Sequence, residues 1–202
     1  MRQNSPELLS RRLRTGTLPE GAVLRALVIN EDERGSFSEF FGASWRVGIK
    51  PVQWSLVSSR RGVLRGMHLH LRHDEYFLLI KGRCCVGLRD LRPGSPTQNH
   101  CCLLEFDDKE PTFITFPRGI LHGWYFFTDS THVQSISDEE YARYHPADNL
   151  GCHWSDSALE IPWPEQPAIV SERADGFPDL RTLQETVSRI LEGAPGATDV
   201  AG

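Results

Sequence analysis

Short hydrophobic segments separated by turn residues recur along most of the chain. The segment 51–59, PVQWSLVSS, alternates hydrophobic and polar residues, which is the pattern of a strand with one buried face. Further strand-like segments cover residues 22–29, 37–41, 63–70, 77–80, 83–88, 101–106, 112–116 and 132–136. Turns rich in Gly, Pro and Asp lie between many of them, at spacings of roughly ten residues, and no helical pattern intervenes. The pattern therefore predicts an all-β sandwich or barrel rather than alternating β/α units.

One helical pattern lies near the C-terminal end of the chain. Asp179 can act as its N-cap, Gly193 can end it, and an apolar stripe lies between them, formed by Leu180, Leu183, Val187, Ile190 and Leu191. We expect this stripe to pack on the outside of the barrel or on another subunit. The predicted organisation is an N-terminal arm (1–20), a β domain (21–178), a C-terminal helix (179–193) and a disordered tail (194–202).

Composition and charge narrow the classes of function. The 202 residues suit one domain with short appendages. A net charge of -5 and a pI near 5.9 argue against the basic surface of a dedicated nucleic-acid binder. No run reaches the roughly 18 apolar residues that span a membrane, and residues 1–16 lack the apolar core of a signal peptide. We therefore expect a cytoplasmic protein with neither nucleic-acid nor membrane partners. Its five cysteines are expected to be buried hydrophobic residues of strands.

The candidate chemistry is concentrated in residues 62–82, GVLRGMHLHLRHDEYFLLIKG. His68 and His70 are two residues apart, so in a strand they point to the same face, and Glu75 follows. Two imidazoles and a carboxylate on one wall can form a metal site, a base with its helpers, or a substrate-binding rim. Alternatively, His70 is a surface or substrate-facing histidine and Glu75 a solvated loop residue.

Two spacings resemble the signature motifs of the cupin superfamily. The first is G-x5-H-x-H-x4-E-x6-G, from Gly62 to Gly82, and the second is P-x-G-x-x-H, from Pro117 to His122. The resemblance implies that residues 21–178 form a cupin jelly roll, or double-stranded β-helix. It also implies a candidate site for a divalent metal, with the ligands His68, His70, Glu75 and His122. Three imidazoles and one carboxylate suit Fe, Mn, Ni, Co or Zn.

A longer resemblance covers residues 32–164. The stretches DERGSFSEFF, VQWSLVSSRRGVLRGMH, LRDLRPGSPT, FPRGILHGW, YARYHP and WSDSALEIPWP are similar to the dTDP-4-dehydrorhamnose 3,5-epimerase family, cupins that usually work without metal and as dimers. The resemblance implies that His68 abstracts a proton beside the 4-keto group of a nucleotide sugar, and that Asp156 orients this histidine. It implies further substrate-binding residues, namely Arg34, Phe37, Glu39, Gln53, Arg65 and His122.

Three positions depart from the family pattern. The family's enolate-stabilising lysine falls on Glu75, its glutamine on His70, and its proton-donating tyrosine near Ser135. Without that tyrosine, inversion would be limited to one carbon, or the product would be a tautomer. A metal ion could replace the lysine as a Lewis acid, but His68 could then not be both ligand and base.

Three hypotheses follow. The leading one is an epimerase or isomerase acting on a dTDP-type 4-keto-6-deoxy sugar as a homodimer. The alternative is a metal-dependent cupin oxygenase or lyase that uses His68, His70, Glu75 and His122. The third is a sugar-nucleotide binder without catalysis.

Overall fold

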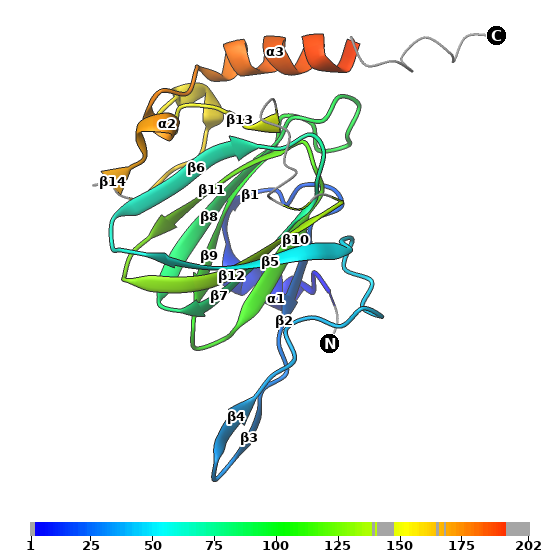
Figure 1. Cartoon of the computed structure of the whole chain (residues 1–202), viewed down its shortest axis with the longest axis vertical. Coiled ribbons are helices and arrows are strands. Elements are labelled where there is room, and N and C mark those ends of the chain that lie inside the picture. Colours follow the sequence, from blue (N-terminus) through cyan, green and yellow to red (C-terminus); the bar gives the residue numbers. More distant parts are fainter. Residues whose placement is uncertain (1–2, 139, 141–147, 165, 168, 193–202) are drawn as a thin grey trace, which may run out of the picture.

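The computed structural model describes residues 3–138, 140, 148–164, 166–167 and 169–192, and two facing β-sheets form its body (Figure 1). The strands are β1 (Leu13–Gly16), β2 (Val23–Ala26), β3 (Asn30–Asp32), β4 (Gly35–Phe37), β5 (Pro51–Ser59), β6 (Val63–Leu69), β7 (Glu75–Lys81), β8 (Arg83–Asp90), β9 (Cys101–Asp107), β10 (Thr112–Phe116), β11 (Ile120–Phe126), β12 (Ser130–Ser137), β13 (Leu150–Gly151) and β14 (Ile169–Val170). The helices are α1 (Pro6–Arg12), the 3₁₀ turn η3 (Ser157–Leu159), α2 (Glu172–Asp175) and α3 (Leu180–Glu192).

The strand order confirms the predicted all-β sandwich. The larger sheet runs β1-β9-β8-β11-β6-β13, with β14 parallel to β6, and the smaller runs β2-β10-β7-β12-β5. From β5 to β12 the chain passes from one sheet to the other at each connection except the β8–β9 hairpin. This crossing between two sheets is the connectivity of a jelly roll.

Alternation along the strands divides the hydrophobic residues between the interior and the outer faces. Cys84 and Val86 of β8 pack with Phe77 of β7 in the core between the sheets. Cys85, their neighbour, packs on the outer face of the larger sheet, where α3 also lies. All five cysteines are free and four are buried, which confirms their predicted role as buried hydrophobic residues.

The first part of helix α3 packs on the outside of the larger sheet, as predicted. Leu180, Leu183 and Val187 are buried against Leu64 and other residues of that face. The last two residues of the predicted stripe, Ile190 and Leu191, are exposed instead. The Thr182 backbone N–H donates to Asp179 Oδ1 at 2.7 Å, so Asp179 caps the helix. Residue 193 and the predicted tail 194–202 lie outside the described residues.

The predicted N-terminal arm is largely folded structure. Within it, β1 pairs with β9 and extends the larger sheet. Leu8 of α1 is 3% exposed and belongs to the core between the sheets. Arg12 is buried too, and its guanidinium lies within ion-pair distance of Glu110 and Asp107. A buried leucine and paired arginine fix this segment to the body.

Strand β11 was not predicted as a strand. It lies at the centre of the larger sheet, between β8 and β6, and all seven of its residues are buried. Both of its faces are covered, so it lacks the hydrophobic–polar alternation that identifies a half-buried strand.

No helix in the part of the chain that is described is long and apolar enough to cross a membrane.

A hairpin of β3 and β4 projects from the body of the molecule (Figure 1). Asn30 pairs with Phe37, and every residue of the two strands is exposed. The predicted strand at 22–29 is accordingly shorter, because β2 ends at Ala26 and the chain then leaves for the hairpin.

Candidate active site

A cavity of about 470 Å³ lies between the sheets, and it collects most of the predicted chemistry. Both sheets line it: His68 comes from β6, His122 from β11, Glu75 from β7 and Gln134 from β12. Arg173 of α2 lines it as well. The jelly-roll connectivity thus brings residues far apart in sequence to one hollow between the sheets.

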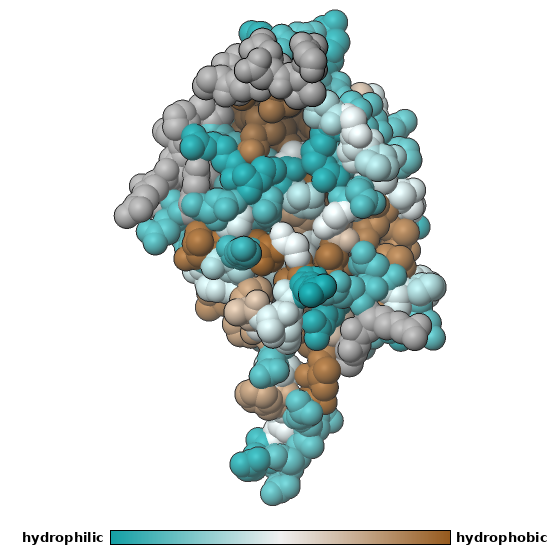
Figure 2. Space-filling view, turned by 90° about the vertical axis from the view of Figure 1, so that its right-hand side faces the viewer, coloured by the Kyte–Doolittle hydropathy of each residue, from teal (hydrophilic) through white to brown (hydrophobic). Residues whose placement is uncertain are grey.

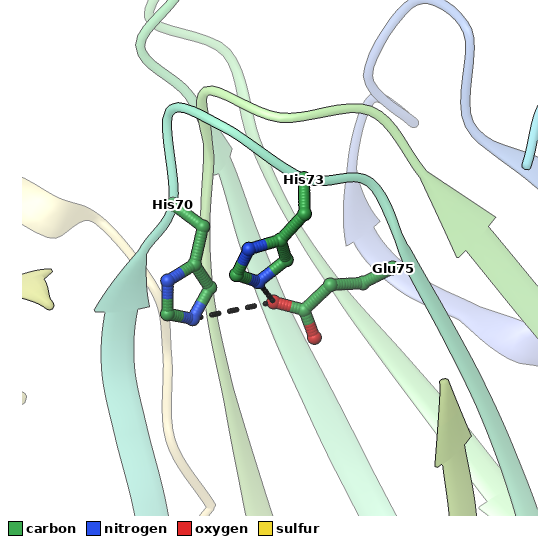
Figure 3. Close-up of side chains that lie close together, drawn as sticks. All are labelled: His70, His73 and Glu75. Carbon is green, nitrogen blue, oxygen red and sulfur yellow. Dashed lines mark ion pairs between the residues drawn. The ribbon is translucent and has the colours of Figure 1, made fainter. Parts of the chain in front are cut away.

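Three histidines surround the side chain of Glu75. Glu75 Oε1 lies 3.2 Å from His122 Nε2, 3.4 Å from His70 Nε2 and 3.8 Å from His73 Nε2. His70 and His73 stand on the connection between β6 and β7, and their rings lie nearly parallel with centroids 4.3 Å apart (Figure 3). Glu75 begins β7 and points back toward both rings (Figure 3). We call these four residues the His-Glu cluster.

Oxygen atoms on the outer side of the cluster determine how its imidazoles are protonated. His70 Nδ1 lies 3.0 Å from the backbone oxygen of Asp148, and His122 Nδ1 lies 3.0 Å from that of Ile120. A carbonyl oxygen only accepts, so each Nδ1–H donates and each neutral ring keeps a lone pair on Nε2. His73 Nδ1 lies 3.7 Å from the carboxylate of Asp148. The Nε2 lone pairs of His70 and His122 therefore face Glu75.

Burial opposes charge throughout the cluster. Glu75 is 6% exposed, and this burial, with the nearby carboxylate of Asp148, raises its pKa to about 8. Burial, followed by the charge of His73, lowers the pKa of His70 to about 3. Burial also holds the pKa of His122 well below its ordinary value. In the absence of a cation, these pKa shifts favour the neutral forms of Glu75, His70 and His122 near pH 7.

His68 lies beside the cluster on the larger sheet, where it pairs in register with His122 on the neighbouring strand. Its ring centroid is 6.1 Å from that of His122 and 6.4 Å from that of His70, and its ring meets Phe177 edge to face. Burial, and then the charges of Arg173 and Arg65, lower the pKa of His68 to about 4. A neutral imidazole in this position is able to accept a proton near pH 7.

The structure changes the predicted metal set by one residue. It brings His70, Glu75 and His122 together as the cupin motifs predict. The third histidine near Glu75 is His73, whereas no ion pair joins His68 to Glu75 among the described residues. His70, His73 and Glu75 each offer a ligand atom within 4.8 Å of the others. The position of His73 depends on the path of the β6–β7 connection, which residue spacing does not show.

Asp156 has a different role from the one that the resemblance implies. Its Oδ2 accepts the Leu180 backbone N–H at 2.7 Å, and its Oδ1 accepts that of Ala158 at 2.9 Å. The carboxylate thus caps η3 and also binds the start of α3. No hydrogen bond or ion pair joins Asp156 to His68 among the residues that the structure describes.

The predicted substrate-binding residues fall into two groups. Arg65 and His122 line the cavity, and Gln53 stands on β5 opposite Ile136, which also lines it. Arg34 and Phe37 lie instead on the projecting hairpin, where Arg34 pairs with Asp32 and the side chain of Phe37 is 64% exposed; Glu39 follows the hairpin and is exposed too. None of these last three lines the cavity.

Sequence reasoning missed several residues of the cavity. Gln134 and Ile136 line it, whereas Ser135, near the position of the family's tyrosine, is buried and donates to the backbone oxygen of Gln53. Successive residues of a strand face opposite sides of the sheet, so Gln134 and Ile136 of β12 face the cavity and Ser135 faces away from it. Arg173 was missed because it lies outside the quoted motifs.

Comparisons with known proteins agree with the fold and identify the family. A family model described as dTDP-4-dehydrorhamnose 3,5-epimerase matches residues 17–182. The dTDP-4-dehydrorhamnose 3,5-epimerase of Shigella flexneri is 30% identical over 152 residues, which cover 70% of this chain and 81% of that protein. The dTDP-4-dehydro-6-deoxyglucose 3-epimerase of Streptomyces bikiniensis is 29% identical over 174 residues, or 82% of this chain and 87% of that protein.

Among solved structures, a similar chain is ChmJ, described as a 3'-monoepimerase from Streptomyces bikiniensis in complex with dTDP-quinovose. It is 27% identical, with a TM-score of 0.74 over 85% of this chain and 89% of that chain. NovW of Streptomyces spheroides, described as a 4-keto-6-deoxy sugar epimerase, is 26% identical, with a TM-score of 0.73 over 87% and 91% of the two chains. These similarities confirm the predicted jelly-roll fold.

Proposed function

This chain belongs to the dTDP-4-dehydrorhamnose 3,5-epimerase family, and from that premise we propose that it is an isomerase of a dTDP-linked 4-keto-6-deoxy sugar. The resemblance seen in the motifs is thereby confirmed. The observation that carries the proposal is His68, a neutral imidazole in a cavity of about 470 Å³. Related structures are described as holding dTDP-quinovose or dTDP, which supports a nucleotide-sugar substrate here.

His68 is proposed as the general base. A hydrogen on the carbon beside a ketone is acidic because the electron pair left behind moves onto the keto oxygen as an enolate. The C–H bond breaks, the proton passes to the His68 imidazole, and the return of a proton to the opposite face inverts the carbon. Arg65 and Arg173 stand beside His68 and oppose its protonation, so the base stays available. Their guanidinium groups also suit the diphosphate of the substrate.

Inversion at a single carbon, or formation of a tautomer, is the proposed outcome. The position of the family's tyrosine falls near Ser135, which cannot take over its role, because its hydroxyl is buried and donates to a backbone oxygen. No tyrosine lines the cavity among the described residues. Relatives described as 3-epimerases act at one carbon by their names, which supports this outcome.

Solvent exchange tests the reaction directly. The protein is incubated with dTDP-4-keto-6-deoxyglucose in deuterium oxide, and deuterium at C3 and C5 is followed by NMR. We expect deuterium at one carbon, and a loss of roughly 10²–10⁴-fold in rate for His68→Gln. His100→Gln is the matched control, because His100 is exposed and does not line the cavity. A folded protein that binds dTDP without exchange at either carbon would instead be a sugar-nucleotide binder.

The epimerase family requires no cofactor for this chemistry. The alternative reaction, a metal-dependent oxygenase or lyase, is not supported by the relatives found, which are named as epimerases or as polysaccharide-biosynthesis proteins. The His-Glu cluster is nevertheless present beside His68.

The projecting hairpin supports a homodimer in which each copy completes the other's site. The resemblance implies that Arg34 and Phe37 contact substrate, yet both stand on the hairpin and neither lines the cavity of its own chain. Beside it, β5 ends the smaller sheet and exposes a hydrophobic row, Val52, Trp54 and Leu56, the last being 73% exposed. Hydrophobic surface also appears where the hairpin leaves the body (Figure 2). A second copy would cover this row and receive the hairpin.

Complementation between two inactive variants tests the shared site. Arg34→Ala and His68→Gln are each measured alone and then mixed under conditions that allow subunit exchange. A shared site predicts recovery of about one quarter of the wild-type activity, because about half of the dimers are mixed and each mixed dimer has one intact site. Sedimentation gives the mass of the assembly. A monomer, or a mixture with no recovered activity from two folded variants, would contradict the shared site.

A further inference from the structure

The His-Glu cluster directs several possible ligand atoms at one point. His70 and His122 each direct an Nε2 lone pair at Glu75 Oε1, at 3.4 and 3.2 Å. Neutral imidazole nitrogens and carboxylate oxygens are the ligand atoms that divalent transition metals bind. The cluster therefore has the donor atoms of a metal site.

A divalent ion satisfies every member of the cluster. Ligand atoms at about 2.0–2.2 Å from such an ion lie about 3.0–3.5 Å from one another. The distances from Glu75 Oε1 to His122, His70 and His73 Nε2 are 3.2, 3.4 and 3.8 Å. The ligand atoms of His70, His73 and Glu75 already lie within 4.8 Å of one another, and His122, which is outside that group, would have to move toward them to become the fourth ligand. The positive charge would also offset the buried carboxylates of Glu75 and Asp148.

The outer contacts are those of metal-binding histidines. In such sites the ring nitrogen that does not bind metal donates to a carbonyl or carboxylate, which fixes the tautomer. His70 and His122 donate to backbone oxygens in this way, and His73 Nδ1 lies 3.7 Å from the Asp148 carboxylate.

From this geometry we infer that the protein binds one divalent transition-metal ion through His70, His73, Glu75 and His122. Three imidazole nitrogens and one carboxylate suit Zn, Fe, Co, Ni or Mn. The site differs from the set implied by the cupin motifs, because His73 takes the place of His68. That difference leaves His68 available as a base in the same cavity, next to His122 on the neighbouring strand.

The ion's role rests on the proposed function. Glu75 stands where the family resemblance places the enolate-stabilising lysine. A metal ion stabilises charge that develops on a keto oxygen, as a Lewis acid. His68 is the register neighbour of His122, with ring centroids 6.1 Å apart, so the base and the ion would line the same cavity.

The first measurement is metal binding, which needs no substrate. Chelator-stripped protein is titrated with Co²⁺, and the visible d–d absorption gives stoichiometry, affinity and geometry. We expect about one Co²⁺ per chain, and elemental analysis of protein purified without chelator should find a transition metal at a similar ratio. Absence of both the absorption band and any metal in folded protein would overturn the inference.

Three variants separate the two ligand sets. His73→Gln should weaken Co²⁺ binding by more than the roughly 10–100-fold that loss of an outer contact costs. His68→Gln should bind Co²⁺ like the wild type, and so should the exposed control His100→Gln. Loss of Co²⁺ binding in His68→Gln, with binding intact in His73→Gln, would overturn the assignment in favour of the motif-derived set. If His73→Gln does not fold, Asp148→Asn replaces it, with an expected loss of about 10–100-fold.

Deuterium exchange then separates failure of the metal's role from failure of the proposed function. Stripped protein should lose exchange, and added metal should restore it. Full exchange by stripped wild-type protein would refute the ion's role and leave the isomerase proposal intact. Metal binding with the expected ligand dependence, but with no exchange on keto sugars, would refute the isomerase proposal and leave the metal site intact.

Discussion

Glu75 makes the stability of the metal-free protein depend on pH in a way that a single substitution can isolate. Its pKa rises from an ordinary 4.5 to about 8 in the folded protein, chiefly because it is buried. The folded state therefore holds a proton that the unfolded state has released. For an acid shifted in this direction, the stabilising contribution is complete below about pH 4.5 and is lost as the pH rises through about 8.

The size of the effect follows from the proton difference between the two states. Each pH unit over which folding takes up one proton changes the free energy of unfolding by about 1.4 kcal/mol. Between about pH 6.5 and pH 8 the wild type should thus lose on the order of 2 kcal/mol relative to a variant without this carboxyl group. The lowered pKa values of His68, His70 and His122 act in the opposite direction at the lower end of this interval, because unfolded histidines still hold protons near pH 6.5, and they act equally on both proteins.

Urea unfolding in the presence of a chelator measures this loss at a series of pH values. Glu75→Gln should flatten the curve, because glutamine stays neutral in both states, and it should unfold at higher urea than the wild type at pH 8. Glu185→Gln is the matched control, since Glu185 is exposed on α3 and should leave the wild-type slope unchanged. Saturating Co²⁺ should reverse the wild-type slope, because an ion binds the carboxylate better as protons leave. Parallel curves for the wild type and Glu75→Gln without metal would refute the reasoning.

Three further predictions test other parts of the molecule. The exchange rate should stay constant from pH 7 down to about pH 5, because burial chiefly lowers the pKa of His68 to about 4; a fall beginning near pH 6.5 would show an ordinary imidazole. Asp156→Asn should cost about 1–3 kcal/mol of stability, measured by urea unfolding, and leave exchange unchanged, because the carboxylate caps two backbone segments. Loss of exchange in that folded variant would support the predicted pairing with His68. Leu8→Ala should cost about 2–5 kcal/mol in the same urea assay, and a negligible cost would mean that α1 is a loose arm.

Strands with one covered face could be predicted from the sequence, and strands with two covered faces could not. The alternation of residues 51–59 corresponds to β5, whose outer side is exposed. The strand β11 has α3 and neighbouring segments on one side and the smaller sheet on the other, so its residues carry no alternation. The N-terminal helix α1 was missed for another reason. Leu8 is one apolar residue in a polar segment, and only the tertiary structure shows where it is buried.

The candidate site was predictable where strands hold the residues and less so where connections hold them. His68 and His122 are paired neighbours on β6 and β11, and the motifs identified both. His73 lies on a connection that turns back toward Glu75, and the path of that connection cannot be predicted from the spacing of residues along the chain. The role of Asp156 was inferred from family resemblance alone. In the structure, two backbone N–H groups donate hydrogen bonds to the two oxygens of its carboxylate.

The two resemblances in the sequence appeared to require the same imidazole, and the structure separates them. A metal bound by His68 would remove the base that the epimerase chemistry needs. With His73 in the cluster, the ligand set is complete without His68, whose ring centroid stays 6.4 Å from that of His70. His68 then accepts a proton and the neighbouring ion site accepts negative charge, which are the two requirements of enolate formation. The two departures from the family pattern, at His70 and Glu75, can therefore be understood as a single change. They exchange a positively charged side chain for a site that can hold a positive ion, while the base beside that site is retained.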